Sequence, residues 1–131
     1  MKLKASLALA FGLLSGMAYS ATDLVIATVN NRQMVEMQKL SKFFEQANPD
    51  IKLKWVTLEE GTLRQRVTTD IATKGGQFDV MTIGMYETPI WGKKGWLKEI
   101  KPDANYDIDD LLPPIRAGLS VDNKLYAAPF Y

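Results

Sequence analysis

Residues 24–57 read LVIATVNNRQMVEMQKLSKFFEQANPDIKLKWVT, and this stretch decides the fold class. The run at 24–29 is rich in Val, Ile and Thr and ends at two asparagines, which predicts a first strand leading into a turn. Residues 32–47 repeat apolar side chains at helical spacing, with charged side chains between them, which predicts an amphipathic helix. Apolar and charged residues alternate at 51–57, so this segment is expected to be a second strand with one solvent-exposed face, as an edge strand has.

The same alternation of elements continues downstream. Residues 58–61 are expected to form a loop, and the capping-box pair Thr62 and Gln65 predicts a helix that runs to a stop at 74–76. Residues 78–83 predict a third strand. Strands and helices that alternate with short connections imply right-handed parallel crossovers. The expected fold class is therefore α/β, with an open parallel sheet and flanking helices.

The last third of the chain carries weaker signals. A Thr-Pro pair at 88–89 predicts the cap and first position of a short helix. Residues 107–112 predict an acidic helical turn that two prolines end. Residues 121–124 are expected to form a tight turn, and 125–131 a strand.

The composition excludes several function classes. The 131 residues are 47% hydrophobic and 24% charged, which is typical of a folded globular domain. Sixteen basic residues against fifteen acidic ones leave no electrostatic footprint for nucleic acid. Because the chain has no Cys and no His, it has no disulfide, no thiolate nucleophile and no imidazole base, and the common zinc and haem sites are excluded. We therefore expect no cofactor, no metal site and no nucleic-acid partner.

The N-terminus is predicted to be a targeting segment. Two early lysines, an apolar run at 5–14 and small residues at 18 and 20 predict a secretory signal peptide over residues 1–20, cleaved before Ala21. A helix of ten residues spans about 15 Å, roughly half of the hydrocarbon core, so the run is too short for a membrane anchor. A lipid-anchored export signal needs a Cys at the cleavage position, and the sequence has none, so the product is expected to be free in an extracytoplasmic compartment.

The loops that follow the three predicted strands carry the candidate ligand-binding residues. Ligands of open parallel sheets bind beyond the carboxyl ends of the strands, and these loops begin at that rim. Amide, carboxylate and aromatic side chains suit a polyhydroxylated ligand, because they hydrogen-bond its hydroxyls and cover its C–H surface. The candidates are Asn30, Asn31, Glu59, Met85 and Tyr86.

Each candidate also has a purely structural interpretation. Asn30 and Asn31 can simply end a strand, because Asn tolerates turn conformations. Glu59 and Glu60 can be solvated loop charges, and Tyr86 can pack on the proline and tryptophan that follow it. Of the two acids Glu59 is preferred as the ligand contact, because a carboxylate after the second strand can hold two vicinal hydroxyls.

Two further groups of residues are assigned to structure. Trp55, Trp91 and Trp96 are expected to pack in the core, because large apolar side chains are usually buried. The aspartates at 107, 109 and 110 lack the spacing and the glycine of a calcium loop, so they are expected to be a cluster of charges at the start of a helix.

Two other function classes stay open at this point. An exported carbohydrate hydrolase would need two carboxylates drawn from Glu59, Glu60 and Glu87. Adjacent acids on an extended loop face different sides, and no apolar neighbour is evident that would make one of them a general acid. The other alternative is a structural or interaction module. We expect a binding protein rather than an enzyme, with no catalytic residue.

Four segments of the chain are FFEQANP at 43–49, GGQFDVM at 75–81, WLKEI at 96–100 and DNKLYAAPFY at 122–131. In this order and spacing they resemble the periplasmic solute-binding proteins of ATP-binding-cassette transporters, in the sugar and sugar-alcohol branch. The segment TIGMYETPIWG at 82–92 is similar more particularly to the mannitol and sorbitol binders.

This resemblance implies a two-lobed fold in which the lobes close over the ligand. Residues 21–131 would then be an incomplete N-terminal lobe, from a longer gene product. The implied function is capture of a sugar or sugar alcohol in the periplasm, by a monomer, and delivery to an inner-membrane ABC permease. Tyr131 joins the candidate ligand contacts, because the family runs this strand toward the cleft between the lobes.

Overall fold

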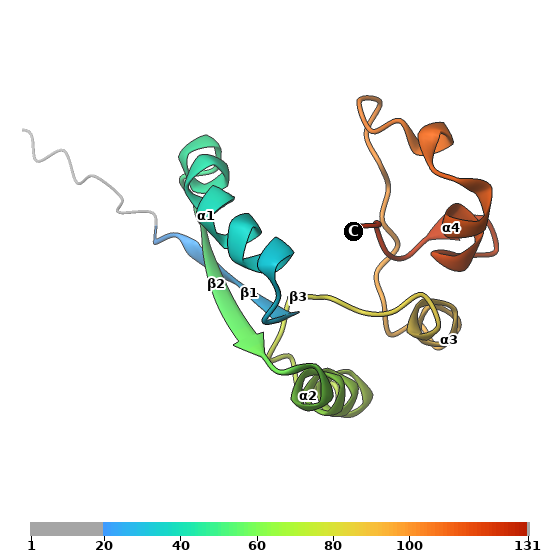
Figure 1. Ribbon diagram of the computed structural model, residues 1–131, viewed down its shortest axis with the longest axis horizontal. Helices are drawn as coiled ribbons and strands as arrows, with labels where there is room; N and C mark the ends of the chain where they lie inside the picture. The colour runs from blue at the N-terminus through green and yellow to red at the C-terminus, as the bar shows by residue number, and fades with distance from the viewer. Residues whose placement is uncertain (1–19, 131) are drawn as a thin grey trace, which may run out of the picture.

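A three-stranded parallel sheet in the order β2-β1-β3 organises the protein (Figure 1). The structure is a computed structural model that describes residues 20–130, so the predicted signal peptide up to residue 19 and Tyr131 lie outside the described residues. The strands are β1 (Thr22–Val29), β2 (Ile51–Leu58) and β3 (Val80–Met81). Both ladders are parallel, as the alternating pattern predicts, and β2 is an edge strand.

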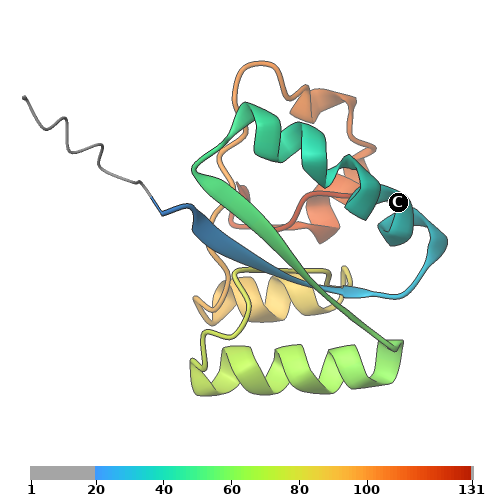
Figure 2. The same cartoon turned by 90° about the vertical axis from the view of Figure 1, so that its left-hand side faces the viewer.

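The helices cover both faces of this sheet. Helix α1 (Arg32–Ala47) and helix α2 (Glu60–Thr73) lie on opposite sides of the strands (Figure 1). Helix α3 (Glu87–Lys93) runs beside α2 (Figure 2). The first strand-helix-strand unit was predicted to within two residues at each boundary. The predicted edge character of β2 is confirmed too, because its charged side chains are exposed.

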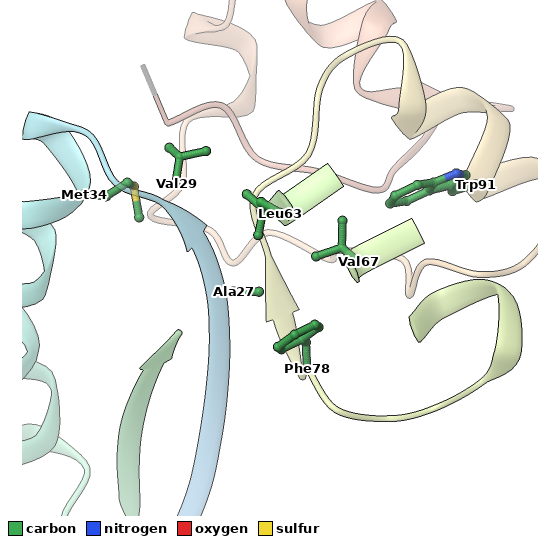
Figure 3. Close-up of a cluster of buried hydrophobic side chains, with 7 residues drawn as sticks. All are labelled: Ala27, Val29, Met34, Leu63, Val67, Phe78 and Trp91. Atoms are coloured by element: carbon green, nitrogen blue, oxygen red, sulfur yellow. The ribbon is translucent and has the colours of Figure 1, made fainter. Parts of the chain in front are cut away.

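The core lies mainly between the sheet and α2 (Figure 3). Leu63 and Val67, one turn apart on α2, are fully buried against Ala27 of β1. The expected packing of the tryptophans is confirmed. Trp91 is 5% exposed, with Trp96 6.4 Å away, and the partly buried Trp55 donates a hydrogen bond from Nε1 to Ser41 on α1.

The start of α2 differs from the prediction. The helix begins at Glu60, with Glu59 as its N-cap, rather than at the capping box of Thr62 and Gln65. Glu59 has extended backbone, its Oε2 accepts the Gly61 N–H at 2.9 Å, and its carbonyl accepts the Leu63 N–H. An acidic cap stabilises the exposed N–H groups of the first turn. The expected loop at 58–61 is reduced to Glu59, which lies between the end of β2 at Leu58 and the start of α2 at Glu60.

The segment around β3 also differs from the prediction. The strand has two residues instead of six, although Asp79 and Thr82 still donate their N–H groups to β1. Helix α3 begins at Glu87, not at the Thr-Pro pair. The Gly84 N–H donates to the Glu87 side chain, and this turn already precedes the helix. The Thr88 hydroxyl therefore donates to the Gly84 carbonyl instead of capping the helix.

The remaining segment forms a small unit against α3. It contains the 3-10 turn η1 (Ile108–Asp110), helix α4 (Pro113–Gly118) and the hairpin of β4 (Ser120–Val121) and β5 (Lys124–Leu125). Helix α4 was missed because its two prolines were interpreted as a break, whereas proline is well suited to the first helical turn. The tight turn is confirmed, with φ of 50° and 61° at its two central residues. The strand predicted at 125–131 ends at Leu125 within the described part of the chain.

Candidate functional site

A pocket of about 410 Å³ lies at the carboxyl ends of β1 and β2. Leu58 is in register with Val29, and the Asn30 N–H donates to the Leu58 carbonyl at 3.0 Å, so the two following turns lie side by side. The structure thereby brings three of the predicted candidates to one pocket. Its lining is Val29, Asn30, Asn31, Thr57, Leu58, Glu59 and Glu60.

Two helices begin at this pocket, and the candidate residues cap them. The Asn31 side chain accepts the Met34 N–H at 2.9 Å and caps α1, so its expected turn role is seen. Glu59 caps α2 through Oε2, and its other carboxylate oxygen has no hydrogen-bond partner among the described residues. The pocket therefore combines the positive ends of two helices with carboxylate and amide acceptors. Such a mixture can donate to and accept from neutral hydroxyl groups.

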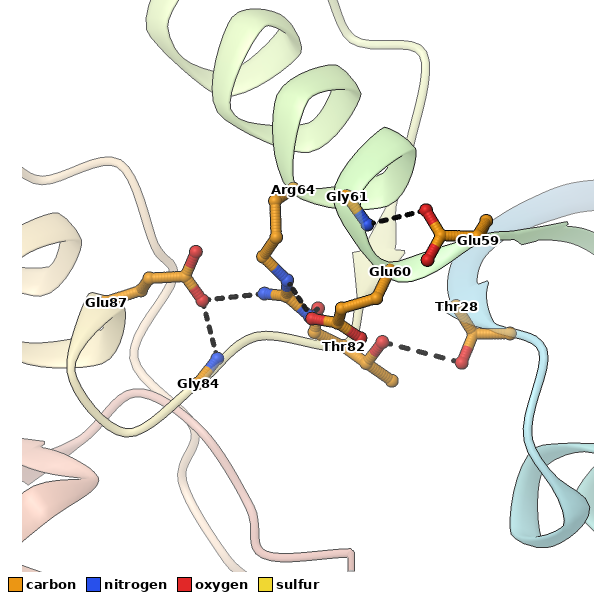
Figure 4. Close-up of polar contacts among 8 residues, drawn as sticks. All are labelled: Thr28, Glu59, Glu60, Gly61, Arg64, Thr82, Gly84 and Glu87. Atoms are coloured by element: carbon orange, nitrogen blue, oxygen red, sulfur yellow. Dashed lines mark hydrogen bonds and ion pairs between the residues drawn. The ribbon is translucent and has the colours of Figure 1, made fainter.

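Arg64 joins this pocket to the loop that follows β3 (Figure 4). Its Nε donates to Glu60 at 2.7 Å, its Nη1 to Glu87 at 2.7 Å and its Nη2 to the Thr82 carbonyl at 3.0 Å. Sequence reasoning missed this residue. The one available signal was the helical i,i+4 spacing of Glu60 and Arg64, which is common on solvated helix faces.

Met85 and Tyr86 do not line the pocket. Both belong to the third loop and are exposed, by 43% and 68%. The Tyr86 ring lies over Gly84, where a Cβ would come within 2.7 Å of it. Met85 lies over Gly118 in the same way. The structure thus places the candidates of the third loop apart from those of the first two.

A second cavity, of about 540 Å³, lies along the first half of α1. It is lined by Met37, Leu40 and polar side chains of α1 together with Phe130, so the last described residues run beside this helix. Tyr131, the remaining candidate ligand contact, lies outside the described residues.

The acidic cluster near residue 109 belongs to a helical turn. Asp109 and Asp110 form the 3-10 turn η1, and Asp109 is ion-paired with Arg116 of α4. Within residues 20–130, no three potential metal-ligating carboxylates are grouped to hold an ion. In the same part of the chain, no helix has the length and apolar character needed to cross a membrane.

An open parallel sheet with a polar pocket at its carboxyl edge defines an α/β protein of the ligand-binding type. The chain belongs to the family of bacterial extracellular solute-binding proteins, whose model matches residues 28–131. The periplasmic-binding-protein-like fold that the resemblance implied is confirmed. The family model and the relatives below describe binding proteins and give no support to a hydrolase.

Three relatives place the chain more closely. A mannitol-binding protein of Pseudomonas aeruginosa is 60% identical over 130 residues, which are 98% of this chain and 30% of that protein. The crystal structure of an ABC transporter solute-binding protein from Agrobacterium vitis S4 with bound D-mannitol has a TM-score of 0.80 and 65% identity, over 83% of this chain and 27% of that one. A solute-binding protein from Agrobacterium radiobacter K84 in complex with ribitol has a TM-score of 0.73 and 25% identity, over 86% and 29% of the two chains. This chain thus spans about 30% of the length of the relatives that it matches.

Proposed function

We propose that this protein captures an acyclic sugar alcohol of the mannitol type outside the cytoplasm and delivers it to an ABC transporter permease. The observation that carries the proposal is the 65% identity to a solute-binding protein that holds D-mannitol. The 60% identity to a mannitol-binding protein points to the same ligand class. Residues 21–131 supply part of the N-terminal lobe in this proposal.

The proposed ligand contacts are the loop residues at the sheet edge. The Glu59 carboxylate would accept from two vicinal hydroxyls, and the amides of Asn30 and Asn31 would donate and accept beside it. Their place around one pocket supports this assignment. Met85, Tyr86 and Tyr131 would cover the C–H surface of the ligand from other segments. Recognition through buried hydroxyl partners discriminates well, because an analogue that lacks a hydroxyl leaves a partner unpaired.

Calorimetric titration tests the ligand class. The protein expressed from its complete reading frame should bind D-mannitol and sorbitol saturably, and a disaccharide such as maltose much more weakly. No polyol should be chemically altered after incubation, because the proposal is capture without turnover. Absence of saturable binding to every polyol would overturn the proposal, and release of product from a chromogenic glycoside would favour the hydrolase instead.

Export and processing form a separate part of the proposal. Residues 1–20 act as the signal peptide, and the mature monomer begins at Ala21 in the periplasm. Small residues at 18 and 20 support this cleavage position. Mass spectrometry of the periplasmic fraction should find an N-terminal peptide that starts at Ala21, whereas recovery of intact Met1 there would contradict the assignment.

A further inference from the structure

Arg64 occupies a central position among the loops at the carboxyl edge of the sheet (Figure 4). Each of its three guanidinium nitrogens donates a hydrogen bond: to Glu60, to Glu87 and to the Thr82 carbonyl. The Glu87 side chain is 8% exposed and that of Arg64 22%, so this ion pair is largely shielded from solvent.

Two of the three partners of Arg64 come from segments outside its own helix. Glu60 is the first residue of α2, one turn before Arg64, next to the N-cap Glu59 and in the lining of the pocket. Thr82 follows β3, and Glu87 opens α3. The Glu87 oxygen that binds Arg64 also accepts the Gly84 N–H at 2.6 Å. The guanidinium therefore links the pocket turn to the backbone of the segment that presents Met85 and Tyr86.

The chemistry of this link favours a geometric role. A guanidinium is a rigid planar fork that fixes the relative directions of its partners, which the single ammonium of a lysine cannot do. The partner Glu60 is 60% exposed, and ion pairs with such exposure contribute little to folding stability. Holding loops in the bound geometry before the ligand arrives, by contrast, reduces the entropic cost of binding.

We propose that Arg64 is a positioning residue for ligand binding: it holds the turn at Glu59 and Glu60 and the segment at Met85 and Tyr86 in the arrangement that the ligand requires. This inference rests on the proposed function. The inference gives a role in that function to Arg64, which does not line the pocket and was not among the candidate ligand contacts.

Three single variants of the full-length protein test the inference by D-mannitol titration. Arg64→Gln should weaken binding about tenfold or more, and Arg64→Lys should fall between that variant and wild type because it keeps the charge but loses the fork. The matched control is Arg66→Gln. It removes the same charge from the same helix, where Arg66 is exposed and lies 5.7 Å from the Phe78 ring, so affinity should stay within twofold of wild type.

A second readout separates positioning from mere stabilisation. Glu87→Gln should weaken binding as Arg64→Gln does, and the double variant should be no worse than the poorer single one, because both changes break the same link. The Gly84 N–H donates a hydrogen bond to the Glu87 carboxylate. Its hydrogen exchange should therefore become faster under native conditions in both Arg64→Gln and Glu87→Gln.

The outcomes distinguish this inference from the proposed function. A wild-type protein that binds no polyol would overturn both. Wild-type binding together with folded Arg64 variants that bind within twofold of wild type would overturn the positioning role alone. A variant with a lower melting temperature but unchanged affinity below its transition would overturn it as well.

Discussion

At the residue scale, Glu59 both caps a helix and lines the pocket. One oxygen caps α2 by accepting the Gly61 N–H, and the residue lines the pocket at the sheet edge. A helix cap is a rigid place for a binding group, because the capping bond fixes the side chain before any ligand arrives. A structural role of Glu59 is thus confirmed, and the proposed ligand contact is compatible with it.

The substitution Glu59→Gln should weaken D-mannitol binding roughly tenfold to hundredfold, because hydrogen bonds to a charged acceptor contribute about 1.5–3 kcal/mol. The glutamine carbonyl can still cap α2, so unfolding should become easier by only about 0.3–1 kcal/mol, the loss of the charge at the helix N-terminus. Calorimetry and urea denaturation measure the two effects. Asp50→Asn is the control, since Asp50 is exposed at the opposite end of the sheet. Unchanged polyol binding in Glu59→Gln would assign recognition to the amide and aromatic side chains.

At the scale of elements, Asp70 fastens the end of α2 to the start of β3. Its side chain is on the helix and 3% exposed, and it accepts the N–H groups of Gln77 and Phe78. One carboxylate therefore accepts the backbone N–H groups of two consecutive residues between α2 and β3. Asp70→Ala should destabilise the full-length protein by about 1–3 kcal/mol, because it leaves the buried Phe78 N–H and the partly buried Gln77 N–H without their acceptor. Urea denaturation measures the loss, with the exposed Thr68→Ala on the same helix as control. A loss below about 0.5 kcal/mol would show that water replaces the carboxylate.

Glu45 links α1 to β2 in a pH-dependent way. The Leu53 N–H donates to Glu45 at 2.8 Å, and this bond, assisted by the charge of Lys52, lowers the pKa of Glu45 below its ordinary value of 4.5. Because the folded pKa is the lower one, the contribution to stability is present above pH 4.5 and is lost as pH falls through the folded pKa. Urea midpoints of wild type and Glu45→Gln should differ at pH 7, and the difference should shrink as the pH is lowered progressively below 4.5. A constant difference across that range would contradict the assignment.

At the scale of the whole molecule, the described residues 20–130 leave apolar side chains exposed. Leu40 and Phe43 of α1 are 51% and 58% exposed, and β3 pairs only with β1 among the described residues. Unpaired strand edges and exposed apolar side chains destabilise an isolated unit. Residues 21–131 expressed alone should therefore unfold over a broad range with little cooperativity in scanning calorimetry. A sharp monomeric transition above about 60 °C would show that this segment is a complete folding unit.

Local patterns were sufficient for the first half of the fold. The apolar periodicity of residues 32–47 and the alternation at 51–57 each specify one element, and three strands separated by helices specify parallel crossovers. The edge at which Asn30, Asn31 and Glu59 lie follows from that topology, since parallel strands end at the same side of a sheet. These conclusions depend on neighbours in sequence, which is why they needed no coordinates.

Tertiary structure decided where the elements begin and what the polar side chains contact. Glu59 replaced the Thr62 box as a cap because the register of β1 and β2 ends at Leu58. Helix α3 begins at Glu87 rather than at the Thr-Pro pair, because the Glu87 carboxylate accepts hydrogen bonds from the Gly84 N–H and from Arg64. Arg64 and Glu87 are 23 residues apart, and no local pattern reports such a pair. The sequence by itself determined the fold class and the edge of the sheet that carries the candidate site. Only the packing of α2 beside α3 decided the Arg64 link, because an ion pair between distant segments forms only once both backbones are in place.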